Sequence, residues 1–402
     1  MGKQKRRAAA SAEDTPAPRT AEEFGDVLLA AAYDVARGIP GAAKACAKRL
    51  ANGFEPPPEL ARGADLAGRR AITRVCRNGW LPEDLDQAAR RRVDEFAVPY
   101  VLDTLAGYAG QFATLHPGWR EQLDDVGAAG WWSTSEPHFT QWAAKHILTP
   151  AEAVTTVVEA LGLLVSMPAL NPVLPAPGTP YRPTAHHTVD EKQLGRVRAL
   201  LAKAESSSFP EEAEALSAKA QELMTRYALD RVLVETAVPD IPASRRLWLD
   251  TPYLDAKSLL VHVVATANRC QAVFDPRWGF VTVVGDENDL DAVALLTTSL
   301  LVQATRAMIA DPAGRSRAFR QSFLVSYATR IGERLGKAAE ATLADSPDAD
   351  RLLPVLASHE VKVKAAFTQL FPEVVGKSVT VRDLDGWDAG RSAADRARLH
   401  GS

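Results

Sequence analysis

Cysteine is scarce in this sequence. Only Cys46, Cys76 and Cys270 occur among 402 residues, an odd number placed far apart along the chain. A disulfide framework or a zinc site built on cysteines needs a paired or closely spaced set, so neither is supported. The scarcity favours a protein of the reducing cytoplasm.

Motifs for the common enzyme chemistries are also missing. The chain has no G-x-x-x-x-G-K-[ST] phosphate loop, no G-x-G-x-x-G turn and no G-x-S-x-G elbow, so P-loop, dinucleotide-binding and serine-hydrolase chemistry lack their usual residues. His359-Glu360 is followed by Val363, where a helical zinc protease needs a second histidine. We therefore expect a binding protein rather than an enzyme, with no cofactor.

Neither sign of charge dominates. Lys and Arg number 47 against 50 Asp and Glu, a net charge of −3, so any nucleic-acid site must be a local patch. No apolar segment of a secretion signal follows the basic start of the chain. The most apolar stretch, 292–310, is interrupted by Gln303 and Arg306 and falls short of the roughly 20 apolar residues that span a bilayer. We expect a buried helix and no membrane association.

Apolar periodicity and proline content divide the chain into five predicted parts. The first part has no periodic apolar pattern, and the second has helical signals. The third is rich in proline and has no acidic residue among the prolines, which is typical of a semi-rigid spacer. A helical hairpin and a mixed domain follow. The predicted boundaries are 1–20 for a disordered tail, 21–166 for an N-terminal helical domain, 167–188 for the Pro-rich linker, 189–238 for the hairpin and 245–400 for a C-terminal α+β domain.

Helix termini are marked most clearly in the N-terminal part. A helix predicted over 62–76 stops at Asn78-Gly79, and the next starts at Pro82 with acids in its first turn, which suit the positive end of the helix dipole. Thr149-Pro150-Ala151-Glu152 opens another helix in the same way. This part of the chain is predicted to be entirely helical.

The C-terminal domain combines helices with short strands. A helix over 257–268 precedes two apolar or β-branched runs, 270–274 and 280–284, which are separated by five residues as in a β-hairpin. Further helices are predicted up to 308, over 316–344 and over 353–370. The predicted fold class is mostly α, with an α-β-β-α-α unit at the C-terminal end.

Two amphipathic helices are expected within 189–238, joined by a capping box at Ser208-Phe209-Pro210-Glu211. Their apolar stripes are Leu194, Val197, Leu201 and Ala204 in the first helix and Ala213, Leu216, Ala220, Leu223, Met224 and Tyr227 in the second. Such a pair has too little core to stand alone, so we expect it to dock on a neighbour.

The motifs LLAKAES, FPEEAEA and KAQELM occur within residues 190–230. With them this segment resembles the bacterial and phage family called domain of unknown function 2786, although Ser207 stands where the family more often has Thr. SFLVSYATRIGERL from Ser322 and GWDAGRSAADRARL from Gly386 are similar to the region that often follows the hairpin. The resemblance implies an architecture and no catalytic residue, because the family has no established activity; its phage members favour a nucleic-acid context.

The most suggestive surface lies on the helix predicted over 316–344. Its cations can neutralise phosphates and its aromatic rings can stack on bases, which suits DNA or a single-stranded nucleic acid. The candidate site residues are Arg320, Phe323, Tyr327, Arg330, Arg334 and Lys337. The alternative is that Phe323 and Tyr327 belong to the core, with the arginines extending past them to solvent.

A second basic surface flanks the turn at 79–82. Two predicted helices carry it, in the general layout of a helix-turn-helix DNA reader. Its residues are Arg69, Arg70, Arg74 and Arg77 before the turn and Arg90, Arg91 and Arg92 after it. A plain helical hairpin with solvated arginines is the competing interpretation.

Two other functions stay open as alternatives. Asp286, Glu287 and Asp289 could hold a hard cation for a metal-dependent hydrolase, although acids at a helix start also stabilise the helix dipole. The hairpin over 189–238 could instead act as a protein-interaction adaptor or oligomerisation module, with a protein or a second copy as the partner.

Overall fold

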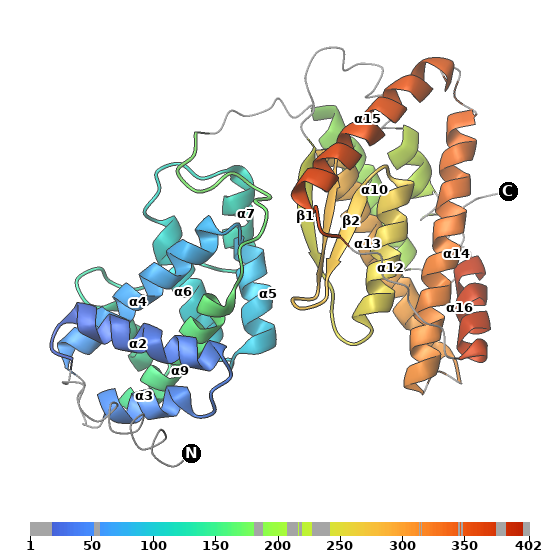
Figure 1. Ribbon diagram of the computed structural model, residues 1–402. Helices are drawn as coiled ribbons and strands as arrows, with labels where there is room; N and C mark the ends of the chain where they lie inside the picture. The colour runs from blue at the N-terminus through green and yellow to red at the C-terminus, as the bar shows by residue number, and fades with distance from the viewer. Residues whose placement is uncertain are drawn as a thin grey trace. The chain divides into compact units, whose positions relative to one another are not determined.

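The computed structural model describes the chain in segments and divides it into two compact units, Met1–Tyr181 and Arg182–Ser402 (Figure 1). The described residues are 18–51, 57–180, 188–206, 216, 219–226, 242–312, 314, 316–344, 346, 349–374 and 383–396. The division falls inside the segment 167–188 that the prolines mark.

The described part of the first unit is built from helices. They are α2 (Ala21–Ala36), α3 (Ala42–Leu50), α4 (Pro58–Arg77), α5 (Pro82–Arg92), α6 (Ala97–Ala109), α7 (Pro117–Asp125), α8 (His138–Lys145) and α9 (Pro150–Ser166). Ten of the 17 residues of α9 are buried, and this helix contacts α2, α3, α4 and α6. A helix that is apolar on most sides belongs at the centre of a bundle.

Two helix starts predicted from the sequence are confirmed, at Pro82 and at Pro150. At the second, the Thr149 hydroxyl accepts a hydrogen bond from the Glu152 backbone N–H, and the Glu152 carboxylate accepts one from the Thr149 N–H at 2.9 Å. These bonds satisfy amide donors that a helix leaves free at its first turn.

The described part of the Pro-rich segment lies against the first unit. Trp80, which is fully buried, donates from Nε1 to the carbonyl of Pro168 at 2.8 Å, and the Leu170 N–H donates to the Asn78 carbonyl at 2.8 Å. Further on, the Gly178 N–H donates to the Thr114 carbonyl. Residues 168–178 therefore pack as part of this unit.

The second unit contains a three-stranded antiparallel sheet in the order β1-β3-β2. Its strands are β1 (Ala243–Trp248), β2 (Gln271–Asp275) and β3 (Phe280–Gly285), with Trp248 and Asp275 both opposite Phe280. The predicted β2–β3 hairpin is confirmed, and its turn is closed by the Asp275 carboxylate, which accepts from the N–H groups of Arg277 and Trp278. All residues of β3 are buried, as a central strand covered on both faces requires.

Strand β1 was not among the predicted elements. Its sequence, ASRRLW, places two arginines where an alternating apolar pattern would mark a strand. One of them, Arg246, is nevertheless buried and lies over the Phe280 ring. A cation packed on an aromatic face fills a core position that the apolar pattern does not reveal.

The second unit also contains helices. They are α10 (Thr188–Ser206), α12 (Leu254–Ala267), α13 (Glu287–Ala310), α14 (Arg317–Ala344), α15 (Ala349–Leu370) and α16 (Leu384–Arg396). Helices α12 and α13 pack on the sheet, and α15 contacts β2 and β3. The mostly helical class with a small α+β C-terminal part is as predicted from the sequence.

The predicted hairpin is described over α10 and over the helical residues 219–226. Val197 and Leu201 from the first helix and Ala220 and Met224 from the second are buried in the same core as α13, which α10 contacts. These four residues of the apolar stripes therefore pack into the core of the second unit itself. The capping box at 208–211 lies outside the described residues.

Helix α13 is the one described helix that, over Asp289–Ala310, is long and apolar enough by itself to cross a membrane, by length and composition alone. Leu296, Leu300 and Ala304 along it are fully buried in the core of the second unit. A core helix of a globular unit meets the same length and composition test, and α13 packs as one here.

Glycines allow α16 to lie very close to α14, side by side in Figure 1. A Cβ atom added to Gly386 would lie 2.5 Å from the Phe319 carbonyl oxygen, and one added to Gly390 would lie 2.2 Å from that of Phe323. Both distances are shorter than any side chain tolerates, so only glycine permits this approach. Ala394, one turn further along, is fully buried.

We predict that Gly390→Ala destabilises the second unit. Its methyl group would meet backbone atoms of α14, and overpacking of this kind costs about 1–3 kcal/mol. Urea denaturation followed by circular dichroism measures the effect. Gly195→Ala on α10, where an added Cβ meets no atom within 4 Å, is the matched control and should be neutral or stabilising. Equal stability of the two variants would contradict the close approach of α16.

Candidate functional site

The aromatic rings of the predicted nucleic-acid surface lie in the core. Phe323 and Tyr327 are each 1 % exposed, and their rings are stacked with centroids 6.3 Å apart. Phe319, one turn earlier, is also buried and continues the row. The expectation that these rings are accessible to bases is therefore wrong, and the alternative that they belong to the core is confirmed.

Most of the cations of that surface bond to neighbouring backbone or carboxylate groups. Arg330 pairs with Glu333, at 2.6 Å, and with Asp395 of α16, and its hydrogen bond lowers the pKa of Glu333. Arg334 donates to the carbonyls of Ala394 and Asp395, so both arginines fasten α16 to α14.

The two remaining cations differ from each other. Arg320 donates from Nε to the Gly314 carbonyl at 2.7 Å. Lys337 is exposed and makes no ion pair with a described residue. Binding of phosphates by any of these four cations stays a prediction.

The acids at the start of α13 are not gathered as a cluster of three or more potential metal ligands among the described residues. Asp289 pairs with Arg269 at 3.0 Å, Asp291 pairs with Arg245, and no three His, Cys, Asp or Glu side chains of the described residues are placed to share an ion. The three acids that suggested a metal-dependent hydrolase are therefore not placed together as one ligand set. Acids at this helix start stabilise the helix dipole and bind neighbouring arginines.

The helix-turn-helix interpretation of α4 and α5 does not fit their packing. Six of the eleven residues of α5 are buried, whereas a recognition helix needs a face free to enter a DNA groove. The turn is covered as well, since a Cβ on Gly79 would lie 2.6 Å from the Leu170 carbonyl oxygen. Helix α5 packs mainly on α6, α7 and α9 and not along α4, so the two helices do not form a packed hairpin either.

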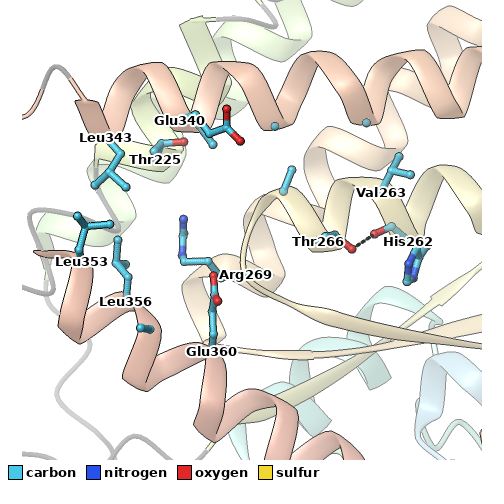
Figure 2. A pocket seen from close by; sticks show the side chains of 15 residues that line it. Thr225, His262, Val263, Thr266, Arg269, Glu340, Leu343, Leu353, Leu356 and Glu360 are labelled. Carbon is cyan, nitrogen blue, oxygen red and sulfur yellow. Dashed lines mark hydrogen bonds between the residues drawn. The ribbon is translucent and has the colours of Figure 1, made fainter. Parts of the chain in front are cut away.

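A cavity of about 600 Å³ opens on another side of α14. It lies where α12, α14 and α15 meet, at the turn that leads into β2, and Figure 2 shows the side chains that enter it. We name it the α14 groove. Its lining comprises Thr225; His262, Val263, Thr266, Ala267 and Arg269; Gly332, Gly336, Ala339, Glu340 and Leu343; and Leu353, Leu356, Ala357 and Glu360.

Two glycines of α14 shape this groove in opposite ways. A Cβ on Gly332 would lie 2.9 Å from the Cβ of Val263, so at this point α12 and α14 touch. A Cβ on Gly336, one turn further, meets no atom within 4 Å. The helices therefore separate beyond Gly332, and the space between them is the groove.

Charges of both signs enter the groove. Figure 2 shows Arg269, Glu340 and Glu360 extending into the same space from three elements. Arg269 is held by Asp289, and both side chains are largely buried, at 14 % and 13 % exposed. Glu340 and Glu360 are exposed and make no ion pair with any described residue. The groove therefore carries two carboxylates whose charge the described residues do not neutralise.

The position of Arg269 is conformationally costly. It follows the C-terminal end of α12 with φ of 61°, in the left-handed region where glycine is the usual residue. A non-glycine residue held there costs on the order of 1–3 kcal/mol and persists only when its surroundings impose it. The ion pair with Asp289 is one such constraint on Arg269, which also lines the groove.

The groove has no activated nucleophile among the described residues. Cys270, next to Arg269, is buried, and burial raises the pKa of its thiol well above the ordinary value. A thiol in that state stays protonated and does not attack substrates. The remaining polar groups, His262, Thr225 and Thr266, suit binding through hydrogen bonds.

A buried polar chain connects the groove to the hairpin. Gln221 donates from Nε2 to the Asn268 Oδ1 at 3.2 Å and to the Thr225 hydroxyl at 3.3 Å, and Asn268 donates to the Val264 carbonyl. Gln221 and Asn268 are at most 1 % exposed. These hydrogen bonds join the hairpin to the end of α12.

Comparison with known proteins identifies one segment. Residues 192–231 match a family described as "Protein of unknown function (DUF2786)", which confirms the resemblance of this segment to that family. The segments from Ser322 and Gly386 lie outside the match. No curated protein and no solved structure matches the chain. Thr225 lies within the matched residues, so the family segment supplies part of the groove.

Neither the groove nor its carboxylates was predicted from the sequence. Its residues come from four separate segments, and no motif links them. The one available signal was the pair Gly332 and Gly336 inside a helix, because glycine is unfavourable there unless packing requires it.

We predict opposite effects for alanine at these two glycines. Gly336→Ala should raise the free energy of unfolding by about 0.5–1 kcal/mol, because alanine favours the helix and its methyl group enters open space. Gly332→Ala should lower it, because the methyl group would meet Val263. Urea denaturation of both variants checks the pair. A destabilising Gly336→Ala would show that the groove is filled at this point.

Proposed function

We propose that this protein is a binding protein whose second unit takes a small organic cation, such as a di- or polyamine, in the α14 groove. The observation that carries the proposal is the pair of carboxylates, Glu340 and Glu360, which face one cavity from two helices without a cationic partner among the described residues. An ammonium group brings the charge and the donors that these carboxylates need.

The size and lining of the groove support a small molecule. A volume of about 600 Å³ is within the range of roughly 300–1,000 Å³ that is usual for ligand sites. Leu343, Leu353 and Leu356 provide apolar surface beside the carboxylates. The methylene groups of an amine can be removed from water against these side chains, which adds to the electrostatic attraction.

The role of Arg269 also favours a cation over an anion. An unpaired arginine in the groove would attract carboxylates or phosphates, but this guanidinium already pairs with Asp289. A ligand anion would have to compete with Asp289 and approach two further carboxylates. Repulsion between a ligand anion and the carboxylates of the groove lowers the affinity for anions.

The proposal keeps the expectation that the chain acts by binding and not by catalysis, in the cytoplasm. The hairpin would then have a structural task, since it holds Thr225 at the groove through Gln221 and Asn268. The adaptor alternative receives less support, because Val197, Leu201, Ala220 and Met224 of the apolar stripes are buried in the core of the second unit.

Calorimetric titration of the full chain with spermidine at low salt tests the proposal. We expect heat of binding with the wild type and at least a tenfold weaker affinity for the double variant Glu340→Gln, Glu360→Gln. Hydrogen bonds to charged groups contribute about 1.5–3 kcal/mol each, and a tenfold change corresponds to about 1.4 kcal/mol.

Glu373→Gln is the matched control for this experiment. It removes the charge of an exposed glutamate of the same unit outside the groove lining, so it should leave the affinity unchanged. The proposal fails if spermidine does not bind the wild type at millimolar concentration, or if the double variant binds it as the wild type does.

A further inference from the structure

A row of arginines lies along the exposed side of α4 in the first unit. Arg69, Thr73 and Arg77 follow one another at intervals of four residues, which places them on one side of the helix. They border a shallow groove of about 470 Å³. Its lining consists of Arg69, Arg70, Thr73, Arg74, Arg77 and Asn78.

The four arginines of this groove are bound to different extents. Arg70 pairs with Asp26 at 2.9 Å and with Glu22, both on α2. Arg74 donates from Nη2 to the Leu164 carbonyl at 2.8 Å, which keeps its charge without a carboxylate. Arg69 and Arg77 are exposed and make no hydrogen bond or ion pair with a described residue.

We infer that this side of α4 binds the phosphate backbone of a nucleic acid, in a way that does not depend on base sequence. The guanidinium groups of Arg69 and Arg77 are planar forks that match phosphate oxygens, and Arg74 adds a third positive charge between them. The Thr73 hydroxyl can donate to a phosphate in the same row.

The length of the row fits several phosphates. Eight residues of α-helix span about 12 Å, so Arg69 and Arg77 lie about that far apart along the axis. Successive phosphates of one DNA strand advance about 3.4 Å along the duplex, so the row covers about four of them. The acids Glu22 and Asp26 set one boundary, because a phosphate backbone must pass on the side of the row away from α2.

Base reading does not enter this inference. The turn after α4 is covered by Leu170, and the row described above contains arginines and a threonine on α4 alone. Contacts to phosphates alone position a protein on nucleic acid and make the affinity depend on salt rather than on sequence. The inference is independent of the ligand proposed for the α14 groove, which lies in the other unit.

Fluorescence anisotropy of a labelled DNA duplex with the full chain, titrated at several salt concentrations, tests the inference. We expect the logarithm of the association constant to fall linearly with the logarithm of salt concentration. Each neutralised phosphate contributes about 0.9 to this slope, so the double variant Arg69→Ala, Arg77→Ala should have a slope smaller by about 1.8. Two duplexes of different sequence should bind equally.

Arg37→Ala is the matched control, because Arg37 is exposed in the same unit, pairs with Asp34 and lies outside the row. It should keep the wild-type slope, and all variants should unfold at the wild-type temperature because the changed side chains are on the surface. No DNA binding at about 50 mM salt, or an unchanged slope in the double variant, overturns the inference. Polyglutamate that competes as strongly as DNA also overturns it and assigns the row to an acidic protein.

Discussion

Close packing around α14 is the constraint on which the second unit depends. Gly332 brings this helix against Val263 of α12, while Gly386 and Gly390 bring α16 against its backbone. Phe323 and Tyr327 fill the core between these contacts. Beyond Gly332, α14 separates from α12 and borders the cavity. The position of the groove therefore follows from where the glycines lie.

The helix termini of the first unit could be predicted because their signals are local. Pro82 and Pro150 begin helices, as the sequence indicates, since proline fits a first helical turn and the acids that follow stabilise it. The β2–β3 hairpin was predictable for the same reason. Strand β1 was not, because its arginines mask the apolar pattern and Arg246 is buried by packing on Phe280, a contact between distant segments.

The candidate site was less predictable than the fold. The sequence shows that rings and cations share a side of the α14 helix, but burial decides between a binding surface and a core, and burial depends on α16, some 60 residues away. The groove is harder still to predict, because it joins Thr225, the end of α12, the C-terminal half of α14 and the first half of α15. Only the fold brings Glu340 and Glu360 to one space.

The most direct test of this account is where a bound amine lies. Nuclear magnetic resonance of the full chain, with methyl-labelled leucines and spermidine, reports which methyl groups approach the ligand. The account predicts Overhauser contacts from the spermidine methylene protons to Leu343, Leu353 and Leu356, which line the groove beside its carboxylates. Contacts confined to leucines elsewhere in the chain, or none with these three residues, would contradict it.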